Sequence, residues 1–128
     1  SNSMQVKLTD RSGDHGVMRL AGGMRILIQC PNPVGDEFQI TIRPEKIRIG
    51  GTDDDPARSW IVGTVIERIY LGSLSQVLVE LPTGERLVVH ELNDDFVSTG
   101  RPGDPIELSW AARHSLVVAG QPATGENP

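Results

Sequence analysis

The residues best suited to hold a charged ligand gather in one short stretch, Arg43-Pro44-Glu45-Lys46-Ile47-Arg48. Proline suits the first position of a helical turn and Glu45 favours its amino-terminal end, so Pro44-Glu45-Lys46 is expected to form one such turn. The basic side chains of Arg43, Lys46 and Arg48 could bind a small oxyanion beside this turn. The alternative, which we favour from the sequence, is that Arg43 makes structural hydrogen bonds or a salt bridge where two lobes meet.

The candidates for catalysis are few and scattered. His15, His90 and His114 lie far apart, and none has metal-ligand spacing to a cysteine or carboxylate, so we expect surface or edge-strand histidines. Cys30 ends an apolar run and is expected to be a small buried hydrophobic residue. No Gly-x-Ser-x-Gly elbow occurs. We therefore predict no catalytic, cofactor or metal site in this chain.

Nucleotide binding of the phosphate-loop type is excluded by the lysines. Such a loop ends in Gly-Lys-Ser/Thr, whereas the two lysines, Lys7 and Lys46, do not follow a glycine. The aspartates at 53–55 lack the alternating spacing and the later bidentate glutamate of a calcium loop. We interpret residues 50–58 as a solvated linker.

Composition narrows the class of protein further. The formal net charge of −5 would repel nucleic acid phosphates and anionic lipid. One cysteine gives no internal disulfide, and no apolar run reaches the roughly 20 residues that span a bilayer. With no visible signal peptide, we expect a protein of a reducing compartment. Ser1-Asn2-Ser3 resembles an expression scar, and we do not include it in the expected fold.

Short β-branched runs separated by glycine and proline predict an all-β fold with almost no helix. The centre is a meander of three strands over residues 61–92, with turns at Leu71-Gly72-Ser73 and at residues 82–85. Further strands are expected at 4–8, 15–20, 24–30, 38–43, 47–49, 106–110 and 116–118. Residues 10–14 are expected to form a turn or loop.

A lone meander is only marginally stable, so the other strands must close around it, and we expect OB-like small barrels. We predict two interleaved lobes in residues 4–120, because the last strand should return to complete the first lobe. Lobe 1 would comprise residues 4–50 and 104–119, lobe 2 residues 59–103, and residues 121–128 would form a flexible tail.

Three segments in this order resemble the C-terminal TOBE (transport-associated OB) region of ATP-binding subunits of bacterial ABC importers of the maltose, glycerol phosphate and polyamine type. They are residues 42–47, 63–73 and 102–110. The resemblance implies a parent chain with an ATPase domain that uses ATP and Mg. Related molybdate-type domains bind a small ligand, but this chain has Ala57-Arg58-Ser59-Trp60 where those domains place Ser-Ala-Arg-Asn.

The resemblance implies a non-catalytic regulatory and dimerisation domain. Its expected partners are a second copy of the parent subunit, the ATPase domain of the same chain and, indirectly, the transporter's membrane subunits. The expected place is the cytoplasmic face of the plasma membrane. The alternative is a domain that senses an oxyanion or the transported solute, with Arg43, Glu45, Lys46 and Arg48 as the candidate ligand or lobe-junction residues.

Overall fold

The computed structural model describes residues 2–29, 37–50, 55–92 and 101–122. The described part is all-β, as predicted, and its only helical segments are three short 3-10 turns. The strands are β1 (Asn2–Lys7), β2 (Asp10–Ser12), β3 (His15–Arg19), β4 (Arg25–Gln29), β5 (Glu37–Ile42), β6 (Arg48–Ile49), β7 (Arg58–Tyr70), β8 (Leu74–Glu80), β9 (Arg86–Leu92), β10 (Pro105–Ala111) and β11 (Leu116–Pro122). The turns are η1 (Ala21–Gly23), η2 (Pro44–Lys46) and η3 (Ala112–His114).

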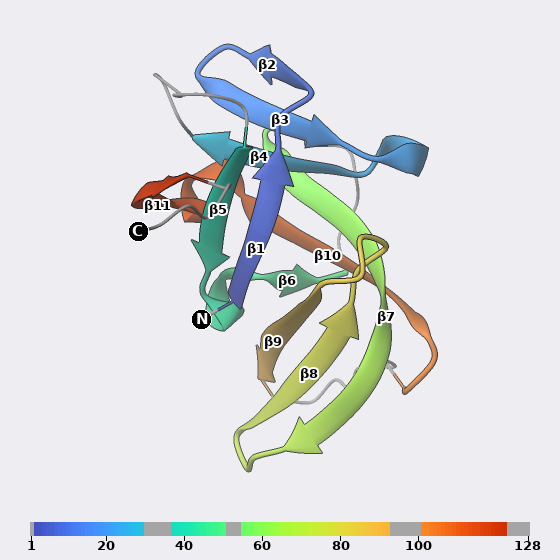
Figure 1. Cartoon of the computed structure of the whole chain (residues 1–128). Helices are drawn as coiled ribbons and strands as arrows, with labels where there is room; N and C mark the ends of the chain where they lie inside the picture. Colours follow the sequence, from blue (N-terminus) through green and yellow to red (C-terminus); the bar gives the residue numbers. More distant parts are fainter. Residues whose placement is uncertain (1, 30–36, 51–54, 93–100, 123–128) are drawn as a thin grey trace.

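The predicted meander is present as β7, β8 and β9, joined in antiparallel pairs (Figure 1). β7 begins three residues earlier than expected, at Arg58. Both predicted turns separate the strands, and Gly72 in the first has a φ of 88°, which a glycine adopts at little cost. Gly63 serves a different purpose, because a Cβ there would stand 2.5 Å from Val79 Cγ1 and 2.8 Å from the Glu80 carbonyl oxygen. The two strands can approach so closely only with glycine at this position.

The strands form two sheets, and in the described chain these sheets do not close into the small barrels that we expected. One sheet has the order β1-β5-β11, and the other follows the path β2-β3-β4-β7-β10-β6, with β8 and β9 added to β7. The reason lies in β7, whose first half pairs with β10 and whose second half pairs with β8, with a register shift between Val65 and Glu67. Because β7 is long and bulged, it pairs with β10 along one half and with β8 along the other, and the strands around it do not form a closed barrel.

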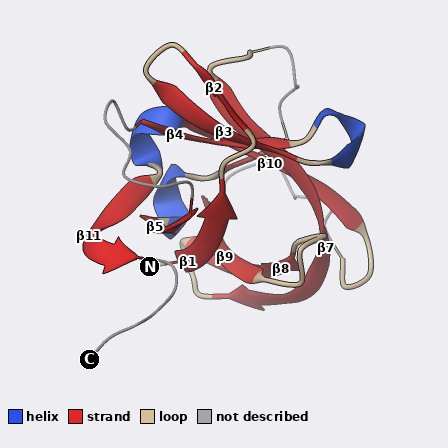
Figure 2. Cartoon of the chain, turned by 45° about the horizontal axis from the view of Figure 1, so that its top comes forward, coloured by secondary structure: helices blue, strands red, loops and turns tan. Residues whose placement is uncertain are grey.

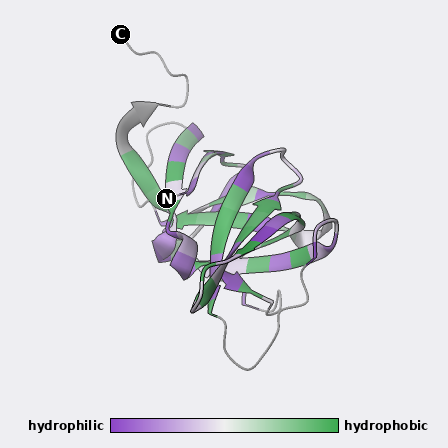
Figure 3. Cartoon of the chain, turned by 90° about the horizontal axis from the view of Figure 1, so that it is seen from below, coloured by the Kyte–Doolittle hydropathy of each residue, from purple (hydrophilic) through white to green (hydrophobic). Residues whose placement is uncertain are grey.

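The last strand returns to the first part of the chain, as predicted, because β11 pairs with β5. The exact boundaries of the two lobes stay a prediction. One continuous apolar core joins both, with Met4, Ile40 and Trp110 in the same cluster as Val77 and Leu87. Figure 2 shows the strands curving around this shared interior, and Figure 3 shows hydrophobic and hydrophilic residues alternating along them.

Three local expectations were wrong. Residues 10–12 form β2, which pairs with β3 around a turn at Gly13 and Asp14, so this segment is a hairpin and not a loop. Asn2 and Ser3 are part of β1, although we had left them out of the fold. β11 extends to Pro122, into the segment that we had assigned to a tail.

Asn2 is only 5% exposed, and its side chain holds β1 against β9. Its Nδ2 donates to the Val88 carbonyl at 2.8 Å, and the Val88 N–H donates to its Oδ1 at 2.7 Å. The amide therefore makes the same two bonds that a neighbouring strand would make with Val88. Whether residues 1–3 derive from expression stays a prediction, but Asn2 contributes to this fold.

Candidate functional site

Arg43, Glu45, Lys46 and Arg48 are all exposed, on either side of the buried Ile47. The predicted helical turn is present as η2, with proline at its start. In the described chain, no side-chain hydrogen bond or ion pair is found for Arg43, so its expected junction salt bridge is absent there. Lys46 and Arg48 instead contribute to a basic cluster that includes residues far away in sequence.

The core of this cluster consists of Arg48, Arg58 and Arg113, which we call the arginine notch. β10 lies between β6 and β7, and it sets the positions of two of them: Arg48 is opposite Ser109, and Arg58 is opposite Ala111. Arg113 follows directly in η3. The Arg58 Nη2 donates a hydrogen bond of 3.3 Å to Ser109 Oγ, which fixes the guanidinium across β10.

Like charges meet at the arginine notch. The pKa of Arg58 is lowered by burial first and then by the positive charge of Arg48, with a smaller effect of Arg113, while Asp55 opposes the shift. The pKa of His114 is lowered by burial and by the charges of Arg113, Lys46 and Arg58. The ion pairs Arg19–Asp10 and Arg68–Glu91 lie elsewhere, and among the described residues no notch arginine has a carboxylate within ion-pair distance.

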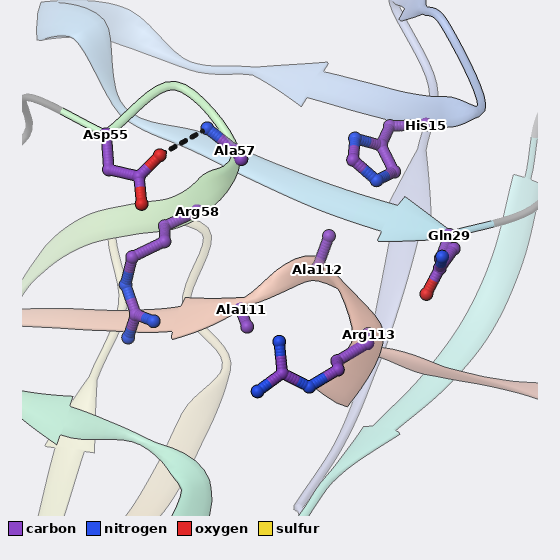
Figure 4. A pocket seen from close by; sticks show the side chains of 8 residues that line it. All are labelled: His15, Gln29, Asp55, Ala57, Arg58, Ala111, Ala112 and Arg113. Carbon is purple, nitrogen blue, oxygen red and sulfur yellow. Dashed lines mark hydrogen bonds between the residues drawn. The ribbon is translucent and has the colours of Figure 1, made fainter.

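A cavity of about 280 Å³ opens beside these arginines (Figure 4). The Arg58 and Arg113 side chains extend toward the position of Ala111, whose methyl group leaves the space between them open. His15 and Gln29 line the opposite wall. Asp55 also lines the cavity, and its Oδ1 accepts the Ala57 N–H at 3.0 Å. The arrangement offers several N–H donors and a net positive charge, which suits an anion.

A second cavity, of about 470 Å³, has the opposite charge. We call it the acidic groove; its lining residues are Gln5, Val6, Lys7, Met18, Glu37, Thr83 and Glu85. The Glu85 carboxylate is oriented by the Gln5 N–H at 2.9 Å and the Thr83 hydroxyl at 3.3 Å. Neither Glu37 nor Glu85 forms an ion pair in the described chain. The two carboxylates outnumber the single ammonium group, that of Lys7, so the groove keeps a net negative charge. With apolar Val6 and Met18 beside them, the carboxylates suit a cation that carries an alkyl chain.

Histidine and arginine positions differ in part from our expectations. His114 is not a plain surface residue, since its Nδ1 is buried and has no hydrogen-bond partner within the described structure. Arg68 has a side chain only 9% exposed and pairs with Glu91 at 2.8 Å. Cys30, Asp53 and Asp54 lie outside the described residues.

The described residues contain no group of three or more histidine, cysteine, aspartate or glutamate side chains placed to hold a metal ion. A search of the described helices finds none with the length and apolar character needed to cross a membrane.

Sequence reasoning missed Arg58, Arg113 and Ser109. Arg58 was considered only as the end of the linker and as a departure from the molybdate-type pattern, and Arg113 was not singled out. The useful observation would have been that each arginine stands at an end of a predicted strand, since strand ends of one sheet can meet at one rim.

These features define a small all-β domain with charged rims. A family model described as "TOBE domain" matches residues 40–118, and the chain therefore belongs to the TOBE domain family. This confirms the resemblance seen in the sequence.

Its curated relatives include proteins named spermidine/putrescine import ATP-binding protein PotA. The protein from Rubrobacter xylanophilus is 37% identical over 113 residues, which are 85% of this chain and 29% of the relative. The protein from Acidothermus cellulolyticus is 33% identical over 129 residues, 97% of this chain and 33% of the relative. The chain thus spans about a third of the length of these relatives.

Among solved structures, the cytoplasmic molybdate-binding protein ModG, with molybdate bound, is similar in fold. The TM-score is 0.71 at 14% sequence identity, and the match covers 91% of this chain and 94% of that one. This likeness supports the OB-like assignment.

Proposed function

We propose that this chain is a non-catalytic regulatory and dimerisation domain of the ATP-binding subunit of a bacterial polyamine-type ABC importer. The observation that carries the proposal is its match to about a third of import ATP-binding proteins, through a TOBE domain. ATP and Mg would act in the remaining two thirds of such a protein. In that setting the domain would lie on the cytoplasmic side of the membrane, contact the ATPase domain of its own chain, and reach the membrane subunits only indirectly.

An exposed apolar patch supports the self-association part. Ile69, Tyr70 and Leu71 are 39%, 66% and 53% exposed at the end of β7, and Leu92 is 72% exposed at the end of β9. Leu92 lies opposite Leu74, the first residue of β8, so these side chains share one end of the meander. Apolar groups gathered at one end of a sheet are suited to a self-complementary contact.

Sedimentation velocity over a range of concentrations tests this part. The chain is expected to pass from monomer to dimer, and Leu71→Ser should shift the equilibrium toward monomer by about tenfold. Leu116→Ser is the matched control, because Leu116 is 48% exposed on β11, away from the meander end. A strict monomer at high concentration would contradict self-association of this domain.

A second candidate is a small-ligand sensing domain, in which the transported solute itself is the ligand. The acidic groove favours it, because a polyamine could place its methylene chain over Val6 and Met18 and its ammonium groups near Glu37 and Glu85. Relatives named for spermidine and putrescine import support that ligand class.

Calorimetry with spermidine tests the second candidate. Glu85→Gln keeps an acceptor for the Gln5 N–H but removes the charge, and it should weaken binding several-fold. Glu67→Gln changes an exposed glutamate of β7 outside the groove, and this variant should bind as the unchanged chain does. Absence of saturable heat with spermidine would exclude the groove as a polyamine site.

A further inference from the structure

β1 is an edge strand, and its outward N–H groups are bonded to side chains instead of to a strand. It pairs with β5 on one side and with no described strand on the other (Figure 1). The Gln5 N–H donates to the Glu85 carboxylate at 2.9 Å, and the Lys7 N–H donates to the Met18 sulfur at 3.3 Å. These two acceptors therefore stand in for the carbonyl oxygens of a neighbouring strand.

The hydrogen bond of Lys7 is the weaker of the two, because a thioether sulfur is a weak acceptor. A carbonyl oxygen in place of the sulfur would strengthen this bond. The N–H and the C=O of one residue point to the same side of an antiparallel strand, so the carbonyls of Gln5 and Lys7 also face outward. No described residue donates a hydrogen bond to either carbonyl on that side.

We propose that an extended, basic peptide segment of another protein binds in the acidic groove by adding a strand to β1. Main-chain hydrogen bonds to Gln5 and Lys7 would supply the affinity, and the groove would select the side chains. The inference goes beyond the proposed function, since it requires neither self-association nor a bound polyamine.

The acidic groove lies along the same edge of β1. Gln5, Val6 and Lys7 form part of its lining, together with Met18 of β3 and residues of the turn between β8 and β9. Both stand-in acceptors, Met18 and Glu85, are among these lining residues. The volume of about 470 Å³ is within the range of pockets that hold ligands. An incoming strand would thus enter space that is already open beside the free N–H and C=O groups.

Charge favours a basic segment. Glu37 lies opposite Lys7 on the neighbouring strand, and with Glu85 it gives the groove two carboxylates against one ammonium group. The bond between the Gln5 N–H and Glu85 is exposed to solvent, so its exchange for a bond to a carbonyl costs little. The released Glu85 carboxylate could then pair with a lysine or arginine of the segment. Because side chains alternate along a strand, the segment should alternate basic and apolar residues.

Amide NMR of the whole chain, titrated with a blocked hexapeptide of alternating lysine and valine, tests the proposal. We expect saturable shifts of the Gln5 and Lys7 amide signals. Hydrogen exchange of the Lys7 amide should become about tenfold slower at saturation, because its N–H gains a stronger acceptor. The Val88 amide is the internal reference and should not change, since its N–H already donates to Asn2 Oδ1.

Modified peptides separate strand pairing from attraction between charges. Two versions of the lysine–valine peptide carry methyl groups on complementary sets of alternate backbone amides, so they have the same charge but only one keeps the N–H groups of the pairing edge. Their affinities should differ by about tenfold. Equal affinities would overturn strand addition. A glutamate–valine hexapeptide should not bind, and binding as tight as that of the lysine–valine peptide would contradict a basic partner.

Variants of the chain test the two sides of the contact. Gln5→Pro removes an outward N–H at an edge, where proline is tolerated, and should weaken peptide binding about tenfold. Far-UV circular dichroism shows whether this variant keeps its fold. Glu85→Gln removes the charge but keeps an acceptor for the Gln5 N–H; it should weaken binding several-fold, and it decides if Gln5→Pro does not fold. Glu67→Gln, outside the groove, should bind as the unchanged chain does.

Absence of saturable shifts at Gln5 and Lys7 would overturn the proposal. Shifts of these signals with protein concentration alone would assign the edge to a second copy of the chain, and this too would overturn it. Calorimetry with spermidine and sedimentation velocity on the same samples separate this failure from failure of the proposed function. A chain that dimerises or binds spermidine but not the peptide would lose only the strand addition. Peptide binding by a strict monomer without affinity for spermidine would leave the inference in place.

Discussion

The meander and the sheet β1-β5-β11 are built from similar apolar strands but are assembled in different ways. In the meander, β7, β8 and β9 follow one another with short turns, and their pairing continues from Thr64 to Leu92. In the other sheet, β1 begins at Asn2, β5 at Glu37 and β11 at Leu116, so almost the whole chain lies between its members. Local pairing closes short loops at low entropic cost, whereas distant pairing depends on the rest of the fold.

The comparison indicates where each region is most easily damaged. The meander depends on the close approach of β7 to β8 at Gly63. The three-stranded sheet depends on a few contacts that tie it to the remainder, such as the Asn2 amide on Val88. The predictions below separate these two kinds of dependence.

The largest effect is expected for Gly63→Ala in the meander. The new methyl group would meet Val79 Cγ1 at 2.5 Å and the Glu80 carbonyl oxygen at 2.8 Å, and backbone cannot move aside cheaply. We expect a loss of about 3 kcal/mol in the free energy of unfolding, measured by urea denaturation.

Gly16→Ala is the matched control for that variant. Its methyl group would meet mainly the ends of the Leu8 side chain, which can move, so the loss should be clearly smaller. Equal losses in the two variants would show that close backbone approach is not what limits β7 and β8.

A medium effect is expected for Asn2→Ala at the seam between β1 and β9. The change leaves the N–H and carbonyl of Val88 without the two bonds of 2.8 and 2.7 Å. We expect a loss of about 2 kcal/mol, measured in the same way.

Gln39→Ala provides the comparison, since it loses only the exposed bond to Ser3 Oγ and should change stability by no more than about 0.5 kcal/mol. If Asn2→Ala proved as mild as Gln39→Ala, the amino-terminal residues would be incidental to the fold.

The smallest effect concerns pH at His114, just before β11. Burial and the charges of Arg113, Lys46 and Arg58 lower its pKa in the folded chain. The unfolded chain therefore takes up a proton first, and stability falls as the pH drops from about 6.5 through the lower folded pKa. The contribution should stay below about 1 kcal/mol, because solvent screens charges at a partly exposed site.

Thermal midpoints at pH 7.5 and 5.5, in buffers without phosphate, test this point. The difference between the two midpoints should shrink in His114→Gln, which cannot take up the proton. It should also shrink in Arg113→Gln, which removes one of the charges that lower the pKa of His114. An unchanged difference in both variants would assign the acid sensitivity to other groups.

The pattern of neighbouring residues was sufficient to predict most of the individual strands and turns. Alternation along residues 38–43 predicted a strand with one buried face, and β5 (Glu37–Ile42) shows that face in Phe38, Ile40 and Ile42. The helical turn at Pro44 was predicted from proline and glutamate. The hairpin at residues 10–19 was missed because Asp10, Arg11 and Ser12 have no apolar alternation; they form a strand because β3 offers its edge.

The candidate site was predicted only in part. Lys46 and Arg48 were chosen because they are close in sequence, but Arg43 and Glu45 share no described side-chain contact with the arginine notch. Arg58 and Arg113 could not be joined to Arg48 in advance, because their meeting depends on the register of β10 between β6 and β7. A shift of that register by one residue would turn alternate side chains to the other face.

The sequence by itself determined the class of structure: β-branched runs bounded by glycine and proline turns specify short strands and hairpins, because these choices act over a few residues. Only the tertiary structure decided that the strands form two sheets and not closed barrels. It alone also placed Asn2 against β9 and brought Arg58 and Arg113 to one cavity. Each of these outcomes depends on which distant strands pair and in which register, and that is settled by burial of one shared core.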